Sequence, residues 1–236
     1  MPRPDDRAPD ALRSVVLERG ASPYAEGSCL IRLGGTLVLC TASVDDTVPG
    51  WRRGSGLGWL TAEYAMLPRA TAERTPRERQ GAGGRTHEIQ RLIGRSLRAA
   101  LKSLDFGERT IRVDCDVLQA DGGTRTAAVT GGAVALADAC SWLERQKGVP
   151  SPFGRLVAAV SVGVVDGETR LDLAYAEDRV AAVDANVVVA APSEYVEVQG
   201  TGEQGTFDRA QLDHLLALAD RGIQTLFEHQ RRALRG

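Results

Sequence analysis

Residues 113–126 read VDCDVLQADGGTRT, and this short stretch contains the pattern of a strand, a tight turn and the beginning of a helix. Apolar and polar residues alternate between Val113 and Val117, which predicts a half-buried strand. Asp114 and Asp116 then lie together on the face opposite the apolar residues. The segment therefore predicts a strand that leads, through a glycine turn, directly into an alanine-rich helix.

The turn of this segment has the composition of a phosphate-binding site. Gly122 and Gly123 let backbone N–H groups approach an anion closely, and the free N–H groups at the start of the next helix carry partial positive charge. Arg125 adds a planar guanidinium that suits bidentate phosphate binding. We interpret the segment as a phosphate site beside two carboxylates. An ordinary strand–turn–helix junction with an Asx-type turn at Asp121 is the alternative.

A second junction, Gly83-Gly84-Arg85-Thr86, has the same character, because glycine and arginine again lead directly into a predicted helix. If the two junctions converge on one anion, Arg85 and Arg125 clamp a phosphate while Thr124 and backbone amides donate neutral hydrogen bonds. Two unrelated helix starts with threonine caps explain the pattern equally well.

Two further aspartates are candidates for binding a metal ion. Asp178 and Asp184 are six positions apart, so they meet only across a turn and not along one helix or strand. Two carboxylates together with substrate phosphate oxygens suit Mg²⁺, which keeps several waters. Scattered surface aspartates are the alternative. The three histidines, at positions 87, 214 and 229, are isolated, so the sequence gives no support for a histidine metal cluster or a Ser-His-Asp triad.

Composition limits the class of protein. The chain has 236 residues, of which 43% are hydrophobic, enough for a proper core. No apolar run is long enough to span a bilayer, and residues 1–10 lack the apolar region of a signal peptide, so we expect a cytoplasmic protein with no membrane partner. The four cysteines, at positions 29, 40, 115 and 140, are far apart in apolar patterns, which predicts buried reduced thiols.

Charge is unevenly distributed along the chain. The net charge is −2, which argues against a generally sticky nucleic-acid binder, yet residues 69–102 contain nine basic residues and three glutamates. The stretch 67–86 has no consistent period and is rich in arginine. Such a long loop is uncommon unless it binds something or is disordered, so we favour contact with a phosphodiester backbone over a merely solvated loop. Its arginines are Arg69, Arg74, Arg77, Arg79 and Arg85.

The order of the predicted elements indicates an α+β protein. Residues 27–44 form a hairpin around Gly34-Gly35, and residues 156–165 and 168–175 form another around Asp166-Gly167. Helical spacing of apolar residues predicts helices over 86–104, 125–146 and 207–234, with Asp208 and Gln211 capping the last. Each hairpin is thus followed by further strand and then helix, which predicts two similar halves.

Several longer segments resemble the bacterial ribonuclease PH family. They occur in the order expected of that family, and the resemblance runs from about Arg7 to Leu234. The segments are AEGSCLIRLGGTLVLCTASV, GWLTAEYAMLPRAT, GGRTHEIQRLIGRSLRA, VDCDVLQADGGTRTA, LDLAYAEDRVAAVDANVVV and VEVQGTGEQGTF.

The resemblance implies the α+β fold of the ribosomal protein S5 domain 2-like class, with residues 1–236 as one domain whose lobes span about 10–147 and 155–234. It implies a phosphorolytic 3′→5′ exoribonuclease, also called a tRNA nucleotidyltransferase. Such an enzyme trims the 3′ ends of precursor tRNA, with rRNA as a further candidate substrate. It uses inorganic phosphate and releases nucleoside diphosphates. The reverse reaction adds nucleotides. A catalytically silent RNA-binding ring subunit and a hydrolytic exoribonuclease are the alternatives.

The resemblance also assigns roles to residues. Phosphate binding falls on Arg85, Gly123, Thr124 and Arg125. Catalysis and Mg²⁺ binding fall on Asp178 and Asp184, and RNA contact falls on Arg69, Arg74 and Arg77. The implied partners are precursor tRNA and other structured RNA with single-stranded 3′ ends, inorganic phosphate as co-substrate, and further copies of the chain in a homohexamer, a trimer of dimers.

Overall fold

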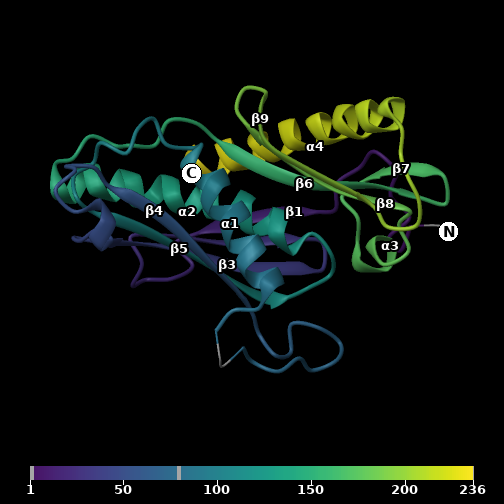
Figure 1. The fold of residues 1–236 in the computed structure, drawn as a ribbon, viewed down its shortest axis with the longest axis horizontal. Helices are drawn as coiled ribbons and strands as arrows, with labels where there is room; N and C mark the ends of the chain where they lie inside the picture. The colour runs from purple at the N-terminus through teal and green to yellow at the C-terminus, as the bar shows by residue number, and fades with distance from the viewer. Residues whose placement is uncertain (1–2, 79–80, 236) are drawn as a thin grey trace.

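The computed structural model describes residues 3–78 and 81–235, which form two β-sheets and four α-helices (Figure 1). The first sheet has five strands in the order β1-β2-β3-β5-β4, and the second has four in the order β7-β6-β8-β9. All neighbouring strands are antiparallel except β4 and β5. The strands are β1 (Val15–Arg19), β2 (Gly27–Leu33), β3 (Thr36–Asp45), β4 (Trp59–Met66), β5 (Thr110–Gln119), β6 (Val157–Val165), β7 (Glu168–Leu171), β8 (Val183–Ala190) and β9 (Glu194–Gly202).

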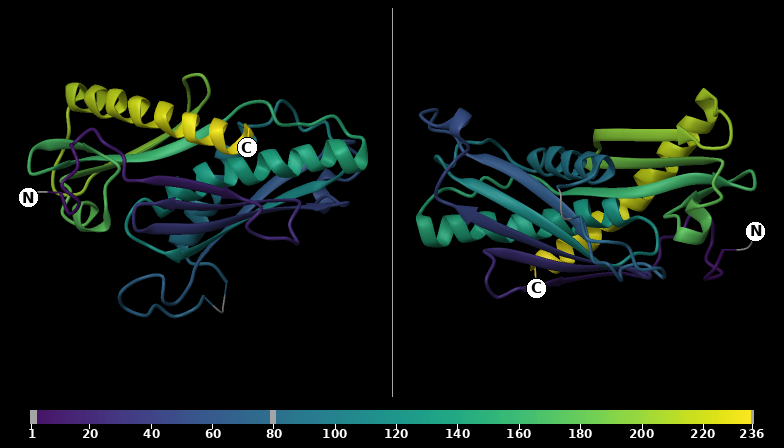
Figure 2. Two further views of the ribbon diagram at one scale, coloured as in Figure 1. Left: turned by 180° about the vertical axis from the view of Figure 1, so that it is seen from behind. Right: turned by 60° about the horizontal axis from the view of Figure 1, so that its bottom comes forward.

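The helices are α1 (Gly84–Arg98), α2 (Thr124–Lys147), α3 (Tyr175–Asp178) and α4 (Arg209–Arg235), with a short 3₁₀ helix at Gly50–Arg52. Helix α2 packs against β2 and β3 of the first sheet and against β6 of the second, so it lies between the two sheets (Figures 1 and 2). Helix α4 packs on the second sheet through β6, β7 and β8. The two sheets therefore share one central helix.

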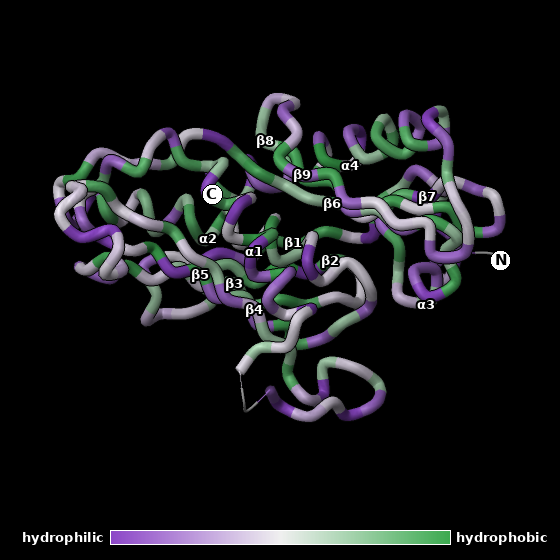
Figure 3. Tube along the Cα trace, viewed as in Figure 1, coloured by the Kyte–Doolittle hydropathy of each residue, from purple (hydrophilic) through white to green (hydrophobic). Residues whose placement is uncertain are grey.

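Helix α2 is the centre of the core. Residues 126–137 are buried without interruption, and seven of them belong to a hydrophobic cluster that includes residues of both sheets. Among the described residues, α2 alone has the length and hydropathy of a membrane span, but 83% of its apolar window is buried inside the protein. In Figure 3 hydrophobic residues follow the central elements, while the loop that projects beyond the first sheet carries several hydrophilic ones.

The local predictions are largely confirmed. Both hairpins form, and Asp166 and Gly167 have φ of 51° and 78°, the conformation that a two-residue hairpin turn requires. The cap of the last helix is present, since Asp208 Oδ1 accepts from Gln211 N at 2.8 Å and Gln211 Oε1 accepts from Asp208 N at 3.0 Å. All four cysteines are free and buried.

Two predicted boundaries are wrong. Helix α1 ends at Arg98 and not near residue 104, because the chain leaves the helix to pair with the segment around Phe153, where Lys102 N donates to Pro152 O. Strand β7 ends at Leu171 and not at residue 175, because Asp172 has φ of 56° and interrupts the extended backbone. The division into lobes of about 10–147 and 155–234 stays a prediction.

Candidate active site

A cavity of about 1090 Å³ lies where the two sheets approach the loop after β4. Its wall includes the turn before α2, the start of α1, helix α3, strand β8 and the first part of that loop. The cavity thus contains side chains that are far apart in the sequence. It brings together all six residues predicted to bind phosphate or metal, which are Arg85, Gly123, Thr124, Arg125, Asp178 and Asp184.

The turn before α2 depends on two glycines. Gly122 and Gly123 have φ of 75° and 66°, a region that residues with a side chain rarely adopt. A Cβ at Gly122 would lie 2.6 Å from Leu173 O, so the turn also packs too closely on the chain before α3 for any side chain. The first backbone hydrogen bond of α2 runs from Ala127 N to Gly123 O. The N–H groups before Ala127 therefore have no partner within the helix and face the cavity end of α2.

Thr124 and Arg125, the first residues of α2, are held by side chains that the sequence did not single out. Thr124 Oγ1 lies 2.9 Å from Tyr64 Oη at the end of β4. Arg125 Nη1 donates to Glu88 Oε1 and to Gln199 Oε1, both at 3.0 Å. Among the described residues, the hydrogen bonds of Arg125 all use Nη1, which leaves Nε and Nη2 for a ligand. No local pattern in the sequence indicates a role for Gln199. Glu88 follows Arg85 by one helical turn, and this spacing could have identified Glu88 as a partner of the arginines.

Glu88 remains ionised in this arrangement. The hydrogen bond from Gln199 and the charges of Arg125 and Arg85 lower the pKa of the Glu88 carboxyl against the opposing effect of burial. Burial raises the pKa of the Tyr64 hydroxyl, so Tyr64 stays neutral and donates or accepts a hydrogen bond at Thr124. The start of α2 is therefore fixed by one charged contact, with Glu88, and two neutral contacts, with Gln199 and Tyr64.

The two aspartates lie in a different electrostatic setting. Asp184 Oδ1 is buried without a hydrogen-bond partner, and burial together with the Asp178 charge raises the pKa of Asp184 to about 6. Burial also raises the pKa of Asp178, although the Arg85 and Arg125 charges act against it. An unpaired buried carboxylate oxygen is costly unless a cation neutralises it. The pair therefore fits a divalent cation that takes oxygen ligands.

These two aspartates provide an incomplete protein ligand set. Within the part of the chain that the structure describes, no group of three or more His, Cys, Asp or Glu side chains is arranged to hold a metal ion. A divalent cation held by these two carboxylates would take its remaining ligands from water and substrate.

Asp114 and Asp116 do not belong to the site. They lie on the half-buried face of β5, as the alternation predicted, but neither lines the cavity. Burial raises the pKa of both carboxyls. The interpretation of a phosphate site beside this particular pair is therefore wrong, and the carboxylates beside the turn are Asp178 and Asp184.

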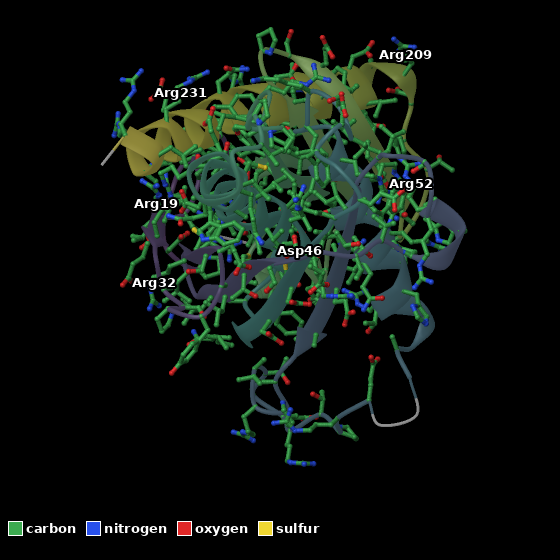
Figure 4. All side chains as sticks on the ribbon, turned by 90° about the vertical axis from the view of Figure 1, so that its left-hand side faces the viewer. Arg19, Arg32, Asp46, Arg52, Arg209 and Arg231 are labelled. Atoms are coloured by element: carbon green, nitrogen blue, oxygen red, sulfur yellow. The ribbon has the colours of Figure 1, made fainter. Side chains whose placement is uncertain are left out.

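The arginine-rich loop forms part of the cavity wall, but the three arginines predicted to contact RNA do not line the cavity. Residues 71–73 and Thr75 line the cavity, while Arg69, Arg74 and Arg77 are exposed and do not. The base of the loop is fixed by Ala70, which is buried and whose carbonyl accepts from Ala120 N at 2.8 Å. Figure 4 shows the loop projecting from the body of the molecule. Arg79 lies outside the described residues.

Comparisons with known proteins give the relationship. Residues 11–141 match domain 1 of the 3′ exoribonuclease family, and residues 155–222 match domain 2. The chain is 58% identical to ribonuclease PH of Rhodococcus erythropolis over 236 residues, which cover 98% of this chain and 90% of that protein. It is also 58% identical to ribonuclease PH of Frankia casuarinae over 238 residues, which cover 100% of this chain and 95% of that protein. The chain belongs to the ribonuclease PH family.

Solved structures extend the ribonuclease PH relationship to the fold. Rice Rrp46 is similar with a TM-score of 0.80 at 20% identity, covering 99% of this chain and 100% of that chain. A subunit of the Archaeoglobus fulgidus exosome, solved with RNA bound to its active site, has a TM-score of 0.81 at 21% identity, covering 96% and 91%. The α+β, ribosomal protein S5 domain 2-like fold that the sequence resemblance implied is confirmed.

Proposed function

We propose that the cavity is the active site of a phosphorolytic 3′→5′ exoribonuclease that trims the 3′ ends of precursor tRNA. The observation that carries this proposal is the joint presence of two arginines at helix starts, Arg85 and Arg125, and two buried carboxylates in one cavity. An anion site beside a cation site is what the transfer of a nucleotidyl group to inorganic phosphate requires. Membership of the ribonuclease PH family supports the same reaction.

In the proposed reaction, Arg85, Arg125 and the N–H groups of the Gly123 turn hold inorganic phosphate with one oxygen directed at the terminal phosphodiester. That oxygen attacks the phosphorus atom in line, and the bond to the 3′ oxygen of the preceding nucleotide breaks. The products are a nucleoside diphosphate and an RNA with a new 3′ hydroxyl. Catalysis then depends on positioning and on charge stabilisation, without a covalent intermediate.

Asp178 and Asp184 are the residues that would hold Mg²⁺, and the buried Oδ1 of Asp184 supports this assignment. The ion would neutralise charge on the transferring phosphoryl group. The carboxylates of Asp178 and Asp184 would determine the position of the ion. Arg125, held at Nη1 by Glu88, presents its other nitrogens to phosphate.

The composition of the cavity disfavours a covalent mechanism and a catalytically silent subunit. Among the described residues that line it there is no histidine or cysteine, so a covalent mechanism lacks a nucleophile–base pair of the usual kind. A catalytically silent RNA-binding subunit would not need buried carboxylates beside two arginines. The retained charges therefore favour an active enzyme.

The finer features of the assembly are also part of the proposal. Single-stranded 3′ ends of tRNA precursors would enter along the exposed arginines at positions 69, 74 and 77. The archaeal exosome relatives support an assembly built from several such subunits, and we expect a homohexamer built as a trimer of dimers. We expect the enzyme to act in the cytoplasm.

Labelled inorganic phosphate gives a direct test. The protein is incubated with an RNA that has an unpaired 3′ end, Mg²⁺ and radioactive phosphate, and the products are separated by charge. We expect labelled nucleoside diphosphates, and no degradation when phosphate is omitted. Unlabelled nucleoside monophosphates formed at the same rate without phosphate would contradict the proposal and favour a hydrolytic nuclease.

A further inference from the structure

A cluster of buried ions lies behind the wall of the cavity. Asp172 and Glu177 are fully buried, and four arginines contact them from the N-terminal segment and from β7. Arg3, close to the N-terminus, is only 5% exposed, so its guanidinium is part of the core. The members of this buried ion cluster are Arg3, Arg7, Arg13, Arg170, Asp172 and Glu177.

Arg13 joins the two parts of the active site through this cluster. Its Nη2 donates to Asp172 Oδ1 at 2.7 Å and its Nε donates to Asp172 Oδ2 at 3.0 Å. The same guanidinium donates to two backbone carbonyls of the phosphate turn, Asp121 O and, at 3.3 Å, Gly122 O. One side chain of the N-terminal segment therefore connects the turn before α2 to a carboxylate that precedes α3.

The turn and α3 are also in direct contact. The Cα of Gly122 packs on the backbone of residues 173–175, where a Cβ would lie 2.6 Å from Leu173 O and 2.7 Å from Tyr175 N. Because no side chain separates the two segments, a shift of either one moves the other. Arg13 lies at this junction and fixes the carbonyl side of the turn.

The other half of the cluster holds α3 itself. Glu177 accepts hydrogen bonds from Arg3 Nε at 2.8 Å, from Arg170 Nη1 at 3.1 Å and from the backbone N of Ala174 at 3.0 Å. The next residue along the chain is Asp178, whose side chain lines the cavity. Positive charges within the cluster outnumber negative ones, so it adds no net negative charge behind the phosphate site.

We infer that Arg13 is a positioning residue for phosphate: it sets the place of the Gly122-Gly123 turn relative to the helix that carries Asp178. This inference rests on the proposed phosphorolytic function, since it assigns the turn to phosphate. Reactions that depend on positioning lose about 100-fold in rate from displacements of about 1 Å. Arg13 acts through the turn and does not line the cavity. A lysine at position 13 retains the charge but cannot form the same planar set of hydrogen bonds.

The test compares R13K and D172N with wild type and with a control variant, R19A. Arg19 also forms an arginine–aspartate pair, with Asp138 at 2.6 Å, and donates to a backbone carbonyl. It is exposed (Figure 4) and does not line the cavity. D172N keeps the shape of the buried side chain and serves if R13K does not fold. The readouts are KM for phosphate, KM for RNA, kcat, and the shift of the melting temperature that inorganic phosphate produces in the absence of RNA.

We expect R13K and D172N to raise KM for phosphate about 10-fold to 100-fold, to lower kcat and to reduce the phosphate-induced thermal shift. KM for RNA should change less than about twofold, and R19A should resemble wild type in every readout. A phosphate KM and thermal shift in folded R13K and D172N equal to those of wild type would overturn the inference. An increase in KM for RNA as large as the increase in KM for phosphate would also overturn the inference.

Failure of the proposed function gives a different result. If wild type degrades RNA without phosphate, phosphorolysis is wrong, but the thermal shift with inorganic phosphate still reports on the turn. A shift in wild type that is reduced in R13K and kept in R19A then supports the role of Arg13. A phosphate-induced thermal shift that is equal in wild type, R13K and R19A would contradict the role of Arg13.

Discussion

Arg125 and Glu88 form a 3.0 Å ion pair that joins the first turn of α2 to α1, just after the first turn of that helix. Helix starts ordinarily attract anions. Here the glutamate lies near the starts of both helices, and the guanidinium of Arg125 neutralises its charge. The pair therefore does more than neutralise charge. It holds one nitrogen of Arg125 and leaves the remaining edge of the guanidinium for a ligand.

Replacing Glu88 by alanine should weaken phosphate binding. Without Glu88, Arg125 keeps Gln199 as its partner but loses the charged contact that orients it. Because the pair is partly exposed, we expect an increase in KM for phosphate of about 10-fold, toward the low end for a charge-assisted hydrogen bond. E88Q, which retains an acceptor oxygen, should show a smaller increase. Steady-state kinetics with varied phosphate measure this, and tighter phosphate binding in E88A would refute the orienting role.

Asp184→Asn should abolish turnover while RNA binding persists. The substitution retains the size of the side chain but removes a charge from the carboxylate whose Oδ1 has no protein partner. We expect kcat to fall by about 100-fold or more, as when an electrostatic group of an active site is lost. Binding of a labelled RNA, measured by fluorescence anisotropy, should change little. Full activity in D184N would remove this residue from the catalytic assignment.

Alanine at Arg69, Arg74 or Arg77 should weaken RNA binding and flatten its salt dependence. Each exposed arginine that contacts a phosphate releases about one counterion, so each loss should reduce the slope of log K against log salt by about 1. R209A is the matched control, because Arg209 is an exposed arginine on α4 that pairs with Asp213 (Figure 4). An unaltered slope in all three loop variants would exclude phosphate contacts there.

Two adjacent glycines of α2 should differ in how much stability is lost when a side chain is added. A Cβ at Gly131 would lie 2.7 Å from Ile31 Cγ2 and 3.1 Å from Cys40 Sγ, while a Cβ at Gly132 would come no closer than 3.3 Å to Leu97 Cδ1. We expect G131A to lose about 1–3 kcal/mol of stability by overpacking. In G132A the helix propensity of alanine should offset a smaller clash. Urea unfolding measures the difference, and equal stability of the two variants would contradict it.

The sequence predicted those features of the fold that depend only on neighbouring residues. The Asp166-Gly167 hairpin, the alternation of β5 and the cap at Asp208 follow from turn chemistry and periodicity within a few positions. The site was less predictable, because its supporting contacts join distant segments. Arg13 is 159 positions from Asp172, and Glu88 is 111 positions from Gln199, so neither pair leaves a periodic signal in the chain.

The burial of α2 has a consequence for how the site moves. Residues 126–137 are enclosed between the two sheets, so the amide protons of this helix should exchange with solvent only through global unfolding. Its first turn carries Thr124 and Arg125. The phosphate end of the cavity is therefore attached directly to the part of the protein that exchanges most slowly. We expect the cavity to open at the loop after β4, where most residues are exposed and exchange should be fast.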